Sequence, residues 1–471
     1  EQQQGIIELA LSGLGPRAAG ATEGIATMLI RTKDTGMQRG MLRLLTSIGP
    51  EAKEAIPAAL SIVGNRSHTL RAEAATALKA MGVTPDPGHL EYLMYVAETA
   101  SDPLDRQEAY EALAKLDRVP SVVIPLLQER FVSDTDNDVA AAAGKALANG
   151  GGTAWNVFKK QLGRRDHNTT FRLTASLGYL REPPEEAITY LILHMTSKDE
   201  AIASMASDSL VRIGREAIPP LLKSLNESSK ADAAATVLGR IGPEALAQLK
   251  LQIHDPKWAV KHAAIKAIGM IGPQAAEVVP DLEAFLDQPD KYDQATVLRA
   301  LGNIGTPART AIPAMTRFAQ DSREEIAVAA IDALGVVGSK GHQVICQLAE
   351  NGTPRQKMLA MKQIQSRQIP LAISGDAIKA HYDQSNLDGQ VQILVSLSKR
   401  TDEKTAVVDF FSQALGSTEV GVRLKAAELL GAMGADAVSA IPALTDARRR
   451  ENGIYRAAFG DAIAAIRRAA K

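Results

Sequence analysis

The sequence has a single cysteine, few aromatic residues and no excess of charge of either sign. Its 471 residues include only Cys346, which excludes an intramolecular disulfide and a zinc cluster built from cysteines. Aromatic residues make up 4% of the chain, so we expect a core of many small aliphatic contacts. The 53 basic and 54 acidic residues give a formal net charge of −1, which provides no whole-chain attraction to nucleic acid or to an anionic membrane.

Long apolar runs are also missing. No segment approaches the roughly 18 apolar residues of a transmembrane helix, and the N-terminus has no signal-peptide pattern. The chain begins with Glu1 and not with Met, which predicts that the natural chain extends upstream. The non-Met start and the single thiol favour export, to the periplasm or cell surface, over the cytoplasm. Cys346 follows Val344-Ile345 in an apolar segment, so we expect a buried structural cysteine in place of a reactive one.

What the sequence does contain is a repeat. The segments Leu238-Gly-Arg-Ile-Gly-Pro243, Ile268-Gly-Met-Ile-Gly-Pro273 and Leu301-Gly-Asn-Ile-Gly-Thr-Pro307 have the same form. From Gly242 to Gly272 is 30 residues, and from Gly272 to Gly305 is 33. A fixed period of this size indicates a solenoid, in which each unit buries its apolar side only by stacking on its neighbours.

One unit runs from Gly305 to Gly338. Gly305 suits the left-handed conformation that closes a helix, and Pro313 suits the first turn of the next one. If that helix began earlier, Pro313 would kink it. Apolar residues at helical spacing mark a first helix at Ile312, Met315 and Phe318, and a second at Ile326, Ala330, Ile331, Leu334 and Val337. A unit is therefore helix A, a turn, helix B and a Gly/Pro turn.

Repetition of this unit predicts an all-α superhelix of about 14 helical hairpins, or about 28 helices, over a single array 1–471. Residues 1–15 form a partial repeat, in which Gly5–Leu14 is a B helix without its A helix. Residues 352–400 are less regular units or a hinge, and 435–471 form a C-terminal capping repeat. Six helix A openings carry an apolar-Pro pair: Ile56-Pro57, Ile124-Pro125, Ile218-Pro219, Val279-Pro280, Ile312-Pro313 and Ile441-Pro442.

Several B segments share a further pattern, as in Arg71-x-x-Ala74-x-x-Ala77-Leu78, Arg106-x-x-Ala109-x-x-Ala112-Leu113, Lys261-x-x-Ala264-x-x-Ala267-Ile268 and Arg423-x-x-Ala426-x-x-Leu429-Leu430. Asp102-Pro103 and Asp255-Pro256 precede two of them. The pattern resembles the HEAT repeat, in the short bacterial form grouped with phycobilisome-lyase HEAT-like repeats. The resemblance implies right-handed stacking, B helices along a concave face, and a ladder of Asp and Arg/Lys between units. Glu324 and Ala327 depart from the pattern and predict a break in that ladder.

The sequence shows no motif for catalysis, a metal or a cofactor. The eight histidines are scattered over different units, and none has the spacing of a metal pair (His68, His89, His167, His194, His254, His262, His342 and His381). No histidine is followed by Glu, as in the iron-binding pairs of deoxyhypusine-hydroxylase-like proteins of similar architecture. The chain also lacks the basic, aromatic groove of alkylpurine-glycosylase-like proteins. We therefore expect no enzyme and no cofactor.

Two groups of residues are candidates for partner binding. In the segment 257–266, Trp258, Lys261, His262 and Ile265 fall off the core stripe, and an aromatic residue flanked by cations is a typical anchor. The alternative is that Trp258 packs on the adjacent unit. At the C-terminus, Arg448, Arg449, Arg450, Arg467 and Arg468 form either the solvated outer face of a capping repeat or a docking patch for an acidic partner.

Three functions are consistent with these patterns. The first is a non-enzymatic scaffold or adaptor that binds a protein or peptide on the concave face near mid-array, since stacked repeats make a long surface and no enclosed pocket. The second is an accessory factor or enzyme of the phycobilin-lyase type, and the third is a nucleic-acid binder. Scattered histidines weigh against the second, and neutral charge weighs against the third.

Overall fold

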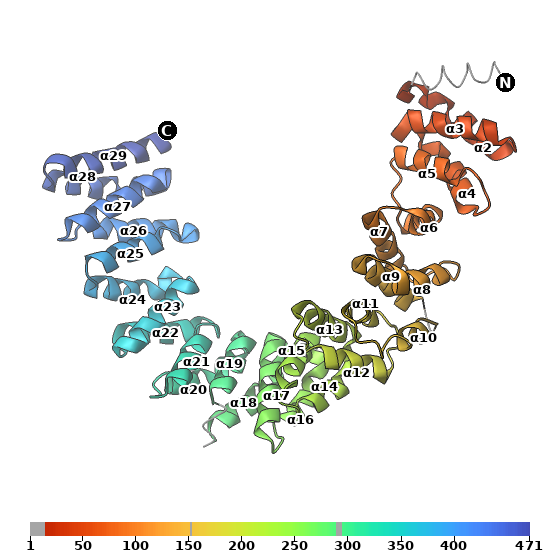
Figure 1. Cartoon of the computed structure of the whole chain (residues 1–471). Helices are drawn as coiled ribbons and strands as arrows, with labels where there is room; N and C mark the ends of the chain where they lie inside the picture. Colours follow the sequence, from red (N-terminus) through yellow and green to blue (C-terminus); the bar gives the residue numbers. More distant parts are fainter. Residues whose placement is uncertain (1–14, 151–152, 289–293) are drawn as a thin grey trace. The chain divides into compact units, whose positions relative to one another are not determined.

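The computed structural model describes residues 15–150, 153–288 and 294–471. Within these ranges every regular element is a helix, either one of the α-helices α2–α29 or a short 3-10 turn, which confirms the all-α prediction. Contacts divide the chain into two compact units, Glu1–Ile241 and Gly242–Lys471. The helices of both units are labelled in Figure 1. Continuity of one array across that boundary stays a prediction. The predicted lone helix at Gly5–Leu14 lies outside the described residues.

Unit 1 consists of seven helix pairs within its described residues. The A helices are α2 (Thr22–Arg31), α4 (Ile56–Gly64), α6 (Leu90–Thr99), α8 (Ile124–Ser133), α10 (Thr153–Lys159), α12 (Glu185–His194) and α14 (Ile218–Ser224). The B helices are α3 (Thr35–Ile48), α5 (Arg71–Ala80), α7 (Pro103–Ala114), α9 (Asn137–Asn149), α11 (His167–Leu177), α13 (Glu200–Ile213) and α15 (Ala231–Ile241).

Unit 2 has the same organisation in the part that the structure describes. Its A helices are α16 (Leu246–Gln252), α18 (Val279–Leu286), α20 (Ile312–Phe318), α22 (Ser339–Asn351), α24 (Leu371–Gln384), α26 (Lys404–Ala414) and α28 (Ile441–Arg450). Its B helices are α17 (Trp258–Ile271), α19 (Gln294–Ile304), α21 (Glu324–Leu334), α23 (Pro354–Ser366), α25 (Leu387–Leu397), α27 (Val420–Met433) and α29 (Gly453–Ala469). The predicted alternation of A and B helices is therefore confirmed within each unit.

The second glycine of each Gly-x-Ile-Gly segment reverses the chain. Gly242, Gly272 and Gly305 have φ of 89°, 73° and 75°, a left-handed region where glycine has no steric cost. A short 3-10 turn follows, and the A helix begins at the predicted apolar-Pro pair in all six units that carry one. Because α20 begins at Ile312, Pro313 lies in the first turn, where its missing N–H removes no helical hydrogen bond.

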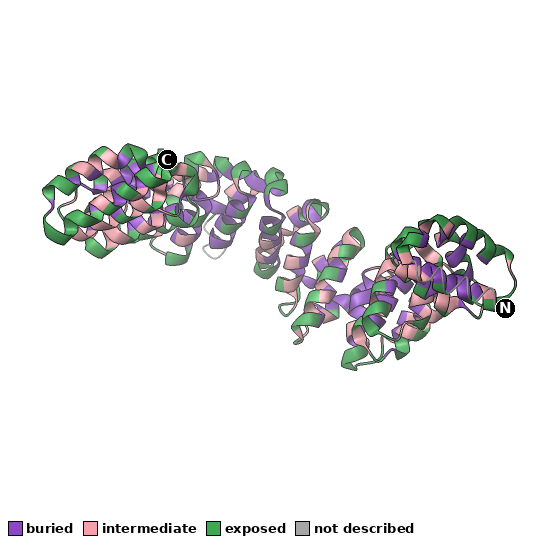
Figure 2. Cartoon of the chain, turned by 90° about the horizontal axis from the view of Figure 1, so that it is seen from above, coloured by how far each residue is buried: buried purple, intermediate pink, exposed green. Residues whose placement is uncertain are grey.

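The first glycine of the same segment has a different role, in packing. A Cβ at Gly269 would lie 2.8 Å from the Cα of Ala300, and one at Gly302 would lie 3.0 Å from the Cα of Ala333. These residues belong to successive B helices, α17 to α19 and α19 to α21, which pack directly against each other. Figure 2 shows buried residues on the sides of helices that face their neighbours. Small residues therefore allow the close approach that makes the core continuous.

Arginines of the B helices link successive pairs. Arg71 Nε donates to the carbonyl of Val63, at the end of its own A helix, at 2.9 Å, and its terminal nitrogen pairs with Glu98 of the next pair at 3.0 Å. Two other arginines also combine a hydrogen bond to a backbone carbonyl with an ion pair. Arg106 contacts the carbonyl of Ser101 and the carboxylate of Asp134, and Arg423 contacts the carbonyl of Ser417 and the carboxylate of Glu451. The expected ladder thus takes the form of Arg–acid pairs. At the predicted break, Ala327 has no charge to pair, but Glu324 of α21 forms an ion pair with Arg355 of α23, the next B helix, so successive B helices remain linked there in a different form.

Residues 352–400 continue the pairing of helices but change the turn. No glycine marks the end of α23, and Gln368 takes the left-handed conformation with φ of 48°. Gln368 is the one non-glycine residue with positive φ in the described part of the chain. The irregular sequence here therefore reflects a turn that uses a strained residue.

Cys346 lies in α22 and is 5% exposed, which confirms the prediction of a buried cysteine. Burial, with a smaller contribution from Glu350, raises the pKa of the thiol to about 11. The thiolate that would react is therefore scarce at neutral pH.

One stretch, Val420–Arg450, has the length and mean hydropathy, 1.3, of a membrane span. It comprises α27, a turn at Gly434 with φ of 59°, and α28. Both α27 and α28 pack against α29, so this stretch is a folded helix pair and not one straight helix.

The close approach at Gly302 predicts the effect of a single methyl group. We expect Gly302→Ala to destabilise the chain by about 1–3 kcal/mol, since the added Cβ meets the backbone of α21 and two helices must shift. The matched control is Gly375→Ala in α24, where a Cβ has no neighbour within 4 Å. Thermal unfolding followed by circular dichroism measures both. A Gly302→Ala variant as stable as the control would contradict this role.

The strained turn predicts a stabilising change. We expect Gln368→Gly to raise the free energy of unfolding by about 0.5–1 kcal/mol, because relief of the left-handed strain exceeds the extra flexibility of glycine in the unfolded chain. Gln392→Gly, in the middle of α25, makes the same change in a regular helix and should cost about 1 kcal/mol. Chemical denaturation distinguishes the two. Equal losses in both variants would show that Gln368 is not strained.

Candidate functional site

The aromatic residue singled out by the sequence lies at the start of a B helix in unit 2. Trp258 is the first residue of α17, and its side chain remains 46% exposed. Lys257 is the N-cap residue, and its side chain does not cap the first N–H groups of α17; its own backbone N–H donates to Asp255 Oδ1 at 2.7 Å. A large exposed aromatic on a B helix is a feature that binding surfaces favour.

His262 lies one turn after Trp258, and its ring packs beside the indole in a tilted arrangement. The two ring centroids are 4.9 Å apart, with planes tilted by 57°. The buried Nδ1 of His262 has no hydrogen-bond partner in the described part of the protein. The imidazole therefore supports one side of the indole and leaves the rest of the Trp258 ring accessible. We call these two residues the Trp258 cluster.

The structure separates the other two predicted residues from this cluster. Lys261 Nζ lies 5.9 Å from the centroid of Phe285, which comes from α18 of the next pair, and His254 stacks on the same ring. Ile265 is fully buried and belongs to the core, so its assignment to a partner surface is corrected. The reason is that α17 packs against both α16 and α19, which covers two faces of the helix instead of one stripe.

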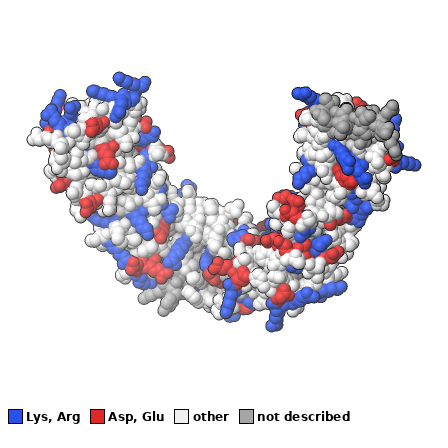
Figure 3. Space-filling view, turned by 45° about the horizontal axis from the view of Figure 1, so that its top comes forward, with Lys and Arg blue, Asp and Glu red and all other residues white. Residues whose placement is uncertain are grey.

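The C-terminal arginines lie at two helix ends. Arg448, Arg449 and Arg450 end α28, and Arg467 and Arg468 lie in the last turn of α29. All five are exposed, and Figure 3 shows basic side chains gathered at this end of unit 2. Arg449 pairs with Asp446 at 3.1 Å. Cations at helix C-termini are favoured by the helix dipole, so their position has a structural cause whether or not a partner binds there.

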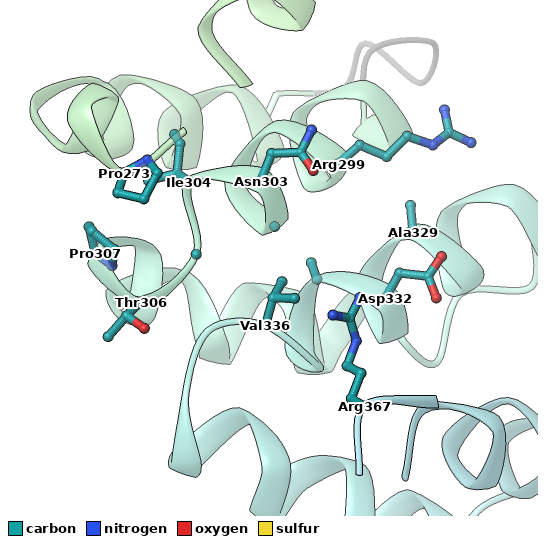
Figure 4. Close-up of a pocket in the computed structure, with 13 residues that line it drawn as sticks. Pro273, Arg299, Asn303, Ile304, Thr306, Pro307, Ala329, Asp332, Val336 and Arg367 are labelled. Atoms are coloured by element: carbon teal, nitrogen blue, oxygen red, sulfur yellow. The ribbon is translucent and has the colours of Figure 1, made fainter. Parts of the chain in front are cut away.

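A groove that sequence reasoning missed lies across three B helices of unit 2. It has a volume of about 840 Å³ and is lined by residues after α17, on α19 and α21, and at the end of α23 (Figure 4). Gly302, Gly305, Ala329 and Ala333 form its floor, because their small side chains leave space between the helices. The larger polar side chains around it are Arg299, Asn303, Thr306, Asp332 and Arg367.

Gln363 of α23 holds two of these polar groups in place. Its Nε2 donates to the Asp332 carboxylate, and its Oε1 accepts a hydrogen bond from Arg367 Nε at 2.6 Å. Gln363 is 7% exposed, so this bridge is fixed by packing. Arg367 also lies across Gly335, where a Cβ would come within 2.7 Å of its Nε. In the sequence, the only sign of this arrangement is the excess of Gln, Lys and Ser after residue 352. Nothing in that composition indicates that these residues contact α21.

Metal-binding geometry is not present among the residues that the structure describes, since no group of three His, Cys, Asp or Glu side chains converges there. The groove and the Trp258 cluster are both surface features of unit 2. Together they provide an exposed aromatic ring, a set of hydrogen-bonding groups and two exposed charges that each contact Gln363.

Comparisons with known proteins identify the repeat. The family profile for HEAT repeats matches residues 22–114, 76–148, 227–290 and 279–356, together more than half of the chain. A search of curated proteins finds no match.

Among solved structures, Kap121p bound to Pho4p is similar at 16% identity, with 99% of this chain and 56% of that chain covered and a TM-score of 0.38. The karyopherin Kap121p bound to the extreme C-terminus of the protein phosphatase Cdc14p is similar at 15% identity, with 96% and 54% covered and a TM-score of 0.37. The chain spans about half the length of these structures.

Proposed function

Because the chain belongs to the HEAT-repeat family, we propose that it is a non-enzymatic scaffold or adaptor that binds a segment of a partner protein on the B helices of unit 2. The observation that supports this most directly is Trp258, an exposed indole on a B helix, steadied by His262. An exposed aromatic side chain can bury a large apolar area on binding, and it has few rotatable bonds to immobilise.

The arrangement of B helices supports the same proposal. Successive B helices pack closely, as α17 with α19 and α19 with α21, and their outer sides form a surface several helices wide. The groove over α19, α21 and α23 is open along this surface. An elongated open surface suits an extended segment of protein better than a small substrate, which is normally enclosed.

Two alternatives stay open as functional classes. An accessory factor of the phycobilin-lyase type would recover pigment-protein components, and a nucleic-acid binder would recover nucleic acid. Affinity capture with the full chain, followed by mass spectrometry and nuclease-sensitive staining, distinguishes them from a protein partner. The bacterial phycobilisome-lyase subtype, export, and a docking role for the arginines at the ends of α28 and α29 remain predictions.

The Trp258 cluster gives the test of the proposed function. We expect Trp258→Ala to weaken binding of the captured partner by about 2 kcal/mol or more, roughly a thirtyfold rise in Kd, since a central anchor is lost. The measurement is isothermal titration calorimetry with the full chain. Lys261 is left unchanged, because its contact with Phe285 joins two helix pairs.

The matched control is Leu193→Ala, which removes an apolar side chain, 60% exposed, from an A helix of unit 1. Helicity and melting temperature are checked first in both variants. Unchanged affinity in Trp258→Ala would remove this residue from the binding site. A loss of stability would instead assign Trp258 to the packing between helix pairs.

A further inference from the structure

The groove over α19, α21 and α23 holds two opposite charges that share a hydrogen-bond partner, Gln363, but make no direct ion pair. Among the described residues, Asp332 and Arg367 form no ion pair, either with each other or with a third side chain. By contrast, Arg299 on the rim is paired with Glu325 at 2.9 Å. Two exposed charges that are not ion-paired, each hydrogen-bonded to Gln363, are the polar features that a ligand would find in this groove.

Gln363 is what keeps the two charges apart and in place. Its amide is bifunctional, so the N–H side contacts the Asp332 carboxylate while the carbonyl side contacts Arg367 Nε. The remaining carboxylate lone pairs and the terminal guanidinium nitrogens are left for a ligand. Figure 4 shows Arg367 reaching from α23 toward α21, where Asp332 lies on the same groove. A buried neutral bridge between two charges thus pre-orders both for binding.

The floor of the groove sets the shape of the ligand. Gly302, Gly305 and Ala333 present backbone and methyl groups only, and Asn303 and Thr306 add hydrogen-bonding groups beside them. An extended peptide backbone can approach such a floor closely, while its side chains reach the charges on either side.

Resting on the proposed function, we propose that this groove binds a short extended segment of the partner that presents a basic side chain to Asp332 and an acidic side chain to Arg367. Each contact is a charge-assisted hydrogen bond, and Arg367 can offer two parallel N–H groups to a carboxylate. The position of Gln363 fixes the separation of the two charges and therefore the spacing of the two side chains in the segment. Gln363 is a positioning residue.

The probes are fluorescein-labelled Gly/Ser peptides that carry one Lys and one Glu at varied spacing, with matched peptides that carry only Lys, only Glu or neither. Fluorescence anisotropy with the full chain measures their affinity. We expect one or two spacings to bind at least about fivefold tighter than either single-charge peptide, because both contacts form together. Equal affinity for all peptides would overturn the proposal.

Single variants assign each contact. Asp332→Asn should remove the advantage of Lys and keep that of Glu, and Arg367→Gln should do the reverse. Gln363→Met retains both charges and should lose the preference for particular spacings, which a purely structural role would not affect. The matched controls are Asp287→Asn and Arg317→Gln, which make the same charge changes at an ion pair between A helices of unit 2, 2.8 Å apart. Equal effects in the controls would attribute the changes to long-range charge alone and overturn the assignment.

Two further outcomes separate this inference from the proposed function and from a small ligand. If Trp258→Ala weakens the captured partner while Asp332→Asn and Arg367→Gln do not, the scaffold role stands and the groove assignment fails. If the unlabelled Lys-Glu dipeptide competes as well as the full peptide, the ligand is a small zwitterion and the claim of an extended segment is overturned. Competition only by the longer peptide supports it.

Discussion

The close approach of successive B helices is the constraint on which the rest of this structure depends. Where α17, α19 and α21 meet, glycine on one helix lies against alanine on the next, with no room for a methyl group between backbones. That distance sets how far each pair is displaced from the last and so keeps the apolar residues of neighbouring pairs in contact. The Arg–acid links, exemplified by Arg71 and Glu98, add polar connections along the same direction.

The same constraint produces the groove. Because glycine and alanine are required where B helices touch, the outer surface above these contacts has few large side chains. The hollow over Gly302 and Ala333 is therefore a consequence of packing. The polar residues at its edges supply the groups that can contact a ligand. A repeat protein can acquire a binding surface in this way by varying exposed residues, without changing those that hold the helices together.

Most of the architecture could be predicted from the sequence, because it is encoded locally. Gly305 and Pro313 specify a chain reversal through their own backbone preferences, and the apolar spacing from Ile326 to Leu334 specifies a helix face. Each signal lies within a few residues and recurs about every 32 residues. A unit whose own pattern is weak can therefore be assigned from the pattern of the other units. The turn at Gln368 was not recognisable in this way, because its left-handed conformation comes from context and not from residue type.

The sequence by itself determined that the chain is a solenoid of HEAT repeats and that Trp258 is an unusual residue on a B helix. Only the tertiary structure decided which neighbours of Trp258 share its surface. Ile265 is buried because α16 and α19 cover α17 on two sides, a condition that a single helical stripe does not contain. Likewise Asp332, Gln363 and Arg367 meet because α21 and α23 stack, although Asp332 and Gln363 are 31 residues apart in the chain. Contacts between repeats depend on packing geometry, which local periodicity predicts in outline but not residue by residue.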